Sequence, residues 1–154
     1  MALFLFACVG VPVEGELPDD SAALQPVGDP GTLAVAFQLD TDLVPEMAEP
    51  PTGTVLGAVY AETDCTAAGP LDGAVPIYEF VTAPLDLGDG AASAVSATTP
   101  PLDPGPVWVL ACLDGDANGC DCADPVTVPN SNKVLVVGAA ETPIVATLDL
   151  LHPC

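Results

Sequence analysis

Apolar and polar residues alternate along several stretches of this chain. In residues 33–39 the large apolar side chains fall at every second position. The same alternation recurs in residues 55–60, 75–81, 107–113 and 144–150, and residues 134–137 form a continuous apolar run. A period of two is typical of strands that bury one face, and no stretch sustains a helical period. With a weaker candidate at 93–97, the pattern predicts about seven strands.

Turn-forming residues separate these strands and limit the architecture. The 18 prolines and 14 glycines are spread along the chain, and Pro76 marks residues 75–81 as an edge strand. Mostly antiparallel strands with one solvated face predict an all-β fold, an Ig-like sandwich of about seven strands in two sheets. We expect one domain over residues 31–154, because 154 residues suffice for one full core but not for two.

The charge balance excludes several classes of partner. The chain has 22 acidic residues and one basic residue, Lys133, for a formal net charge of −21. Nucleic-acid binding needs lysine or arginine to neutralise phosphates, so we expect no nucleic-acid partner. A basic patch for anionic lipids is missing for the same reason. Most of the acids are expected to solvate the surface, and such a charge favours cations or cationic partners.

The first thirty residues resemble an export signal followed by a tether. The apolar run at 2–13 is shorter than the roughly 20 residues that a membrane-spanning helix needs. We predict a signal-like segment over residues 1–12 and an acidic, proline-rich tether over residues 13–30. Leu5-Phe6-Ala7-Cys8 resembles the lipobox of bacterial lipoproteins, which makes Cys8 the lipidation candidate. The alternative is an apolar N-terminal strand that buries Cys8.

The signal-like segment with its lipobox predicts an extracytoplasmic protein. Such a protein is either secreted or held at a bacterial outer membrane or cell surface by a lipid anchor. No other membrane contact is expected. The six cysteines agree with an oxidising compartment. Cys120 and Cys122 are too close in sequence to bridge each other comfortably, so each is expected to reach another partner. The disulfide candidates are Cys65, Cys112, Cys120, Cys122 and Cys154. A zinc site is the weaker alternative, because the paired ligand spacing of structural zinc sites is missing.

An oxygen-rich loop follows the strand predicted at 107–113. With Asp114 as position 1, Asp116 and Asn118 fall at positions 3 and 5 of an EF-hand-type calcium loop, and Gly119 falls at the turning position. The second half departs from that pattern, since Asp121 and Asp124 are each one position short and no glutamate closes the site. The predicted ligands of a structural calcium ion are Asp114, Asp116, Asn118, the Cys120 carbonyl, Asp121 and Asp124. The alternative is a turn in which these side chains cap their own backbone.

Three short motifs resemble a known family of sandwiches. They are GTVLGAVYA at 53–61, LDGAV at 71–75 and PGPVWVL at 104–110. Together they look like the carboxypeptidase-regulatory-like, prealbumin-type sandwich. The loop after the last motif is similar to that of the B-type repeats of bacterial surface adhesins, where it binds calcium. The resemblance implies a structural or adhesive module, because domains of this kind are seldom catalysts.

The sequence offers little for catalysis. The single histidine, His152, lies between Leu151 and Pro153 and does not look like a fixed general base. The prealbumin-type hydrolases depend on several histidines and an arginine. This chain has one histidine and no arginine. We expect no enzyme, and no cofactor other than structural calcium.

Two functions follow from these observations. The first is a surface or secreted structural module, with a protein or glycan partner at the cell surface and with self-assembly left open. The alternative is a carbohydrate- or ligand-binding module that uses Trp108, Tyr60 and Tyr78. Burial of Trp108 would favour the first, and an exposed aromatic platform would favour the second.

Overall fold

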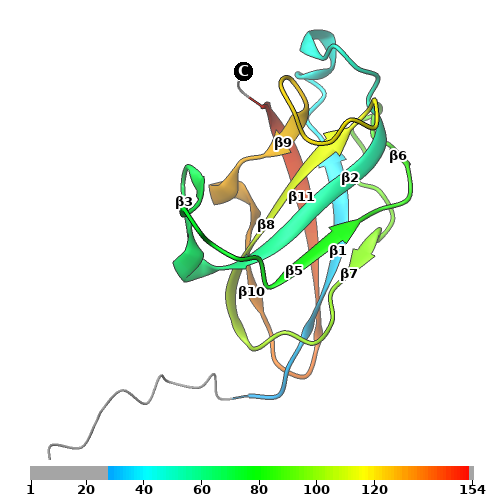
Figure 1. Ribbon diagram of the computed structural model, residues 1–154. Helices are drawn as coiled ribbons and strands as arrows, with labels where there is room; N and C mark the ends of the chain where they lie inside the picture. Colours follow the sequence, from blue (N-terminus) through cyan, green and yellow to red (C-terminus); the bar gives the residue numbers. More distant parts are fainter. Residues whose placement is uncertain (1–27, 153–154) are drawn as a thin grey trace, which may run out of the picture.

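The computed structural model describes residues 28–152, which form an all-β fold (Figure 1). The longest strands are β1 (Thr32–Leu39), β2 (Thr52–Ala61), β8 (Gly105–Asp114) and β11 (Glu141–Leu151). The shorter strands are β3 (Cys65–Thr66), β4 (Gly69–Pro70), β5 (Tyr78–Val81), β6 (Leu85–Asp86), β7 (Ala97–Thr98), β9 (Pro125–Thr127) and β10 (Lys133–Val136). Short 3-10 turns η1 (Val44–Glu46), η2 (Glu62–Asp64) and η3 (Pro129–Asn132) connect them.

Nine of these strands belong to one large, mostly antiparallel sheet. Its order is β5-β2-β8-β9-β11-β1-β7, with β10 paired to β8 and β6 paired to β2. The one parallel pair among the described strands is β1 with β11. The sheet curls until it is nearly barrel-shaped, so β2 and β8 lie in front of β1 and β11 in Figure 1. Strands β3 and β4 form a separate small hairpin.

The core fills the space between the two halves of the curled sheet. Phe37 from β1 meets Phe80 from β5, with ring centroids 5.8 Å apart. The alternation predicted for 33–39 is confirmed, since the side chains at every second position are buried. The main core residues are Leu33, Val35, Phe37 and Leu39 of β1, Val55 and Val59 of β2, Val107, Val109 and Leu113 of β8, and Ala146 and Leu148 of β11.

Most of the predicted strands are confirmed, with changes at their limits. The stretches 33–39, 55–60, 107–113, 134–137 and 144–150 coincide with or overlap β1, β2, β8, β10 and β11. Strand β5 begins only at Tyr78, after Pro76, and it lies at the end of the sheet path as that proline indicated. The weak candidate at 93–97 meets β7 only at Ala97. Strands β3, β4, β6 and β9 were not predicted.

Buried threonine hydroxyls complete the hydrogen bonding where strands are short. Thr82, Thr99 and Thr127 are all buried. Their Oγ1 atoms accept hydrogen bonds from the backbone N–H groups of Val55, Leu33 and Ala111, respectively, at 2.9–3.0 Å. A buried N–H without a partner is costly, so these hydroxyls stabilise β1, β2 and β8 at positions that have a ladder partner on one side only.

Asn132 plays a similar role at the end of η3. Its side chain is fully buried. Its Nδ2 donates to the carbonyl of Val128 at 2.9 Å, and its Oδ1 accepts from the N–H of Thr147 at 2.9 Å. The amide therefore fastens η3 to β11.

A glycine in β2 makes room for an aromatic ring in the core. A Cβ atom placed on Gly57 would lie 2.2 Å from Cζ of Phe80, which is far inside van der Waals contact. Phe80 also packs against Phe37 and Tyr78, so its ring is held from several sides. The absence of a side chain at Gly57 is therefore required by the packing of β5 on β2.

Gly57→Ala is expected to lower the free energy of unfolding by about 1–3 kcal/mol, because the added methyl must displace the Phe80 ring. Chemical denaturation of the purified chain measures this. In a Phe80→Leu background the same change should cost clearly less, since the ring is gone. Equal losses in both backgrounds would show that Phe80 is not the obstacle.

Candidate functional site

The oxygen-rich loop begins where β8 ends. Asp114 is 6% exposed, and both of its carboxylate oxygens are engaged by the loop backbone. Its Oδ1 accepts from the N–H of Asn118 at 3.2 Å, and its Oδ2 accepts from the N–H of Gly119 at 3.1 Å. The side chain thus closes the turn that follows it, as aspartates in many loops do.

Asn118 connects the remaining acids of the first half of the loop. Its Nδ2 donates to Asp116 Oδ2 at 2.7 Å and to Asp121 Oδ2 at 3.0 Å. The N–H of Asp121 donates to Asp124 Oδ2 at 2.9 Å. The structure therefore brings Asp114, Asp116, Asn118, Asp121 and Asp124 into one hydrogen-bonded loop.

In this arrangement the loop is closed by its own hydrogen bonds. The carboxylates face N–H donors, whereas calcium needs six to eight oxygen ligands directed at one point. Within residues 28–152, no group of three or more His, Cys, Asp or Glu residues could hold a metal ion. The turn interpretation is favoured by these contacts, and calcium binding stays a prediction.

A disulfide braces the loop. Cys112 of β8 is bonded to Cys120, with Cα atoms 6.0 Å apart. Cys122 is also disulfide-bonded. Cys65 is a buried free thiol, so this candidate is not part of a bridge, and burial raises the pKa of its thiol. Cys8 and Cys154 lie outside the described residues.

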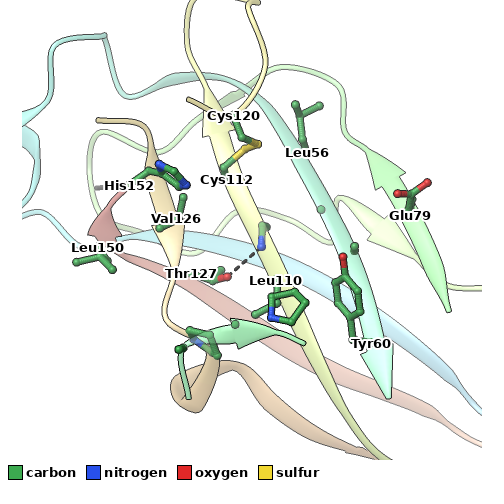
Figure 2. A pocket seen from close by; sticks show the side chains of 17 residues that line it. Leu56, Tyr60, Glu79, Leu110, Cys112, Cys120, Val126, Thr127, Leu150 and His152 are labelled. Carbon is green, nitrogen blue, oxygen red and sulfur yellow. Dashed lines mark hydrogen bonds between the residues drawn. A yellow bond between two sulfur atoms is a disulfide. The ribbon is translucent and has the colours of Figure 1, made fainter. Parts of the chain in front are cut away.

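A groove of about 700 Å³ lies on the outer face of the sheet (Figure 2). Its floor is formed by outward-facing side chains of β2 and β8, among them Leu56 and Leu110. Figure 2 shows Cys120 at one end and Tyr60 towards the other, with Glu79 on one side and Leu150 on the opposite side. Parts of the β3–β4 hairpin also line it.

The backbone of His152 is fixed at this groove. Its N–H donates to the carbonyl of Asp124 at 2.8 Å, and its carbonyl accepts from the N–H of Ala123 at 3.0 Å. The ring lines the groove beside Val126. The two cysteines in the lining, Cys112 and Cys120, are bonded to each other and carry no free thiol. The lining therefore contains no histidine–thiol pair of the kind used in nucleophilic catalysis.

The three aromatic residues predicted for ligand binding lie in different surroundings. Trp108 is 6% exposed, and η2 and η3 pack against its strand. Tyr78 is half-buried against Phe80, with ring centroids 6.2 Å apart. Of the three, Tyr60 alone lines the groove. The structure therefore does not assemble them into one aromatic platform.

Comparison of the chain with known protein families, with curated proteins and with solved structures finds no match. Within residues 28–152 no helix is long and apolar enough to cross a membrane.

Asp114→Asn is expected to lower the free energy of unfolding by about 1–3 kcal/mol, because an amide NH₂ would then face one of the two backbone N–H donors. Urea denaturation measures the loss. Asp103→Asn, at an exposed position, is the matched control and should change little. If both variants lose the same amount, the contacts of Asp114 contribute nothing specific.

Asp114→Asn also tests whether the loop binds calcium. If the loop is closed by its own N–H groups, the melting midpoint of the wild-type chain is the same in calcium and in chelator. A calcium-dependent rise that Asp114→Asn abolishes would instead establish the predicted metal site.

Asp124 predicts a pH dependence of stability. Burial raises the pKa of its carboxyl group by desolvation, the hydrogen bond from the N–H of Asp121 lowers it by less, and the neighbouring acids Asp121, Asp114 and Asp116 raise it. The folded-state pKa therefore lies above the unfolded value of about 3.9. Its contribution to stability is fully present below the unfolded pKa and is lost as pH rises through the folded pKa.

In Asp124→Asn this contribution is absent at every pH. The wild-type chain should therefore gain more stability than the variant when the pH is lowered from 7 to below 4. Urea midpoints of the two proteins at several pH values measure the difference. Parallel pH profiles would contradict the raised pKa.

Proposed function

We propose that this chain is a non-catalytic structural or adhesive module of the cell exterior, with an Ig-like or prealbumin-like sandwich braced by disulfides. The burial of Trp108 carries the proposal. An aromatic residue that binds sugars or other planar ligands exposes its ring, whereas this one is almost fully covered. The single tryptophan therefore serves packing.

The surroundings of Trp108 support this interpretation. Lys133 lies with its Nζ 6.0 Å from the ring centroid and pairs with the exposed carboxylate of Glu62. The indole Nε1 is buried and has no hydrogen-bond partner among residues 28–152. The burial of the whole indole supports a packing role, because a tryptophan that binds a ligand leaves its ring accessible.

The cysteines support a place outside the cytoplasm. The Cys112–Cys120 disulfide and the bonded Cys122 lie beside each other in a short loop. Disulfides of this structural kind persist in oxidising compartments and are rare in the cytosol. Together with the lipobox-like segment ending at Cys8, they support a lipoprotein or a secreted protein.

The carbohydrate- or ligand-binding alternative is favoured by one observation. Tyr60 is half-buried and lines the groove on the outer face of the sheet. One tyrosine gives a smaller stacking surface than a row of aromatic residues, so we place this function second.

The location is tested by fractionating bacteria that express the full chain. We expect the wild-type protein in the membrane fraction, with a mass that includes acyl chains on Cys8 and with Cys112 and Cys120 oxidised. Cys8→Ser should lose the lipid and leave the membrane, whereas Cys65→Ser should not. A cytoplasmic wild-type protein with free thiols at Cys112 and Cys120 would contradict the proposal.

A further inference from the structure

The outer face of β2 and β8 is apolar over three consecutive outward-facing pairs, between the Thr54–Asp114 pair at one end and the ends of the strands at the other. The register pairs Leu56 with Cys112, Ala58 with Leu110 and Tyr60 with Trp108, and these side chains point away from the core. Strands of an antiparallel sheet usually carry polar residues on the face that meets water. Here neither strand carries charge between these three pairs, and the one charge of the two strands, Asp114, lies at the end of β8 with its carboxylate turned to the loop. This part of the outer face is therefore suited to contact with something apolar.

The groove gives this face the dimensions of a binding site. Its volume of about 700 Å³ lies within the range of small-molecule sites. Its floor crosses four neighbouring strands, from Val126 of β9 through β8 and β2 to Glu79 of β5. Three inter-strand spacings amount to about 14 Å, which matches an extended chain of roughly ten carbons.

The charges around the groove favour a positively charged ligand. Glu79 is the one carboxylate among the lining residues, and it is exposed at the rim. The other titratable side chains in the lining are His152, at the opposite side, and Tyr60. The single lysine of the chain lies outside the groove and pairs with Glu62. With a net charge of −21 the whole molecule repels anions and attracts cations.

We propose that this groove binds an elongated amphipathic organic cation. The apolar body lies across Leu56, Leu110 and Val126, and an ammonium or guanidinium group lies against Glu79. A smaller hollow of about 370 Å³, which shares Leu56, Gly57 and Glu79 with the groove, leaves room for the headgroup. The site is independent of the structural role proposed above, because it uses the face of the sheet that the core does not.

The test uses decyltrimethylammonium below its micellar concentration, with 1-decanol and decyl sulfate as the neutral and anionic probes. Isothermal titration calorimetry on the full chain measures the affinities. We expect the ammonium to bind about tenfold more tightly than the alcohol, because the Glu79 carboxylate is only partly screened at the rim. Decyl sulfate should bind least.

Variants assign the effect to the groove. Glu79→Gln should lower the affinity for the ammonium about five- to tenfold and leave that for the alcohol unchanged. Glu141→Gln, at an exposed position of β11 outside the groove, is the matched control for net charge and should have no effect. Ala58→Phe fills the floor and should abolish binding of both probes, with an unchanged melting midpoint as the check on folding.

Several results would overturn the proposal. If Glu79→Gln and Glu141→Gln weaken binding equally, the attraction belongs to the net charge and not to this site. Absence of binding by all three probes, or preference for an oligosaccharide or a Lys-containing apolar peptide at Ala58, would assign the face to another occupant. A dimer in sedimentation equilibrium that Ala58→Phe dissociates would assign it to a second copy of the chain.

Discussion

The pairing of β2 with β8 is the interaction on which the rest of the structure depends. It runs without a break from Thr54 opposite Asp114 to Ala61 opposite Val107. Because side chains alternate between faces, a slip by one residue would turn Val55 and Val59 out of the core. The same register places the outer apolar side chains side by side and positions the start of the oxygen-rich loop. The core, the groove and the loop therefore share one determinant.

Alternation in the sequence was sufficient to predict the long strands, because the buried side chains of residues 33–39 and 107–113 repeat every second position over several residues. Strands β3, β4 and β6 are two residues long and carry no period that could be recognised. Strand β9 begins at Pro125, a residue that local patterns treat as a break. The hydroxyl of Thr99 bonds the N–H of Leu33, which is 66 residues away in the chain, and no local pattern indicates such a contact.

The oxygen-rich loop could be predicted from the sequence to a greater extent than the groove. The residues of the loop were predicted to come together and do so, but their spacing alone could not decide whether the carboxylates face an ion or N–H groups. The groove was not predicted, because its lining comes from strands that are distant in sequence. One signal was present: residues 107–113 are apolar at nearly every position, which is typical of a strand covered on both faces.

The single lysine has a consequence for proteolysis. Proteases of the trypsin class cut after lysine or arginine, so this chain offers them one peptide bond, between Lys133 and Val134. That bond lies in β10, where both residues are paired with β8, and the lysine side chain is held by Glu62. A protease must bind its substrate as a free extended segment, so digestion has to wait until β10 detaches from the sheet.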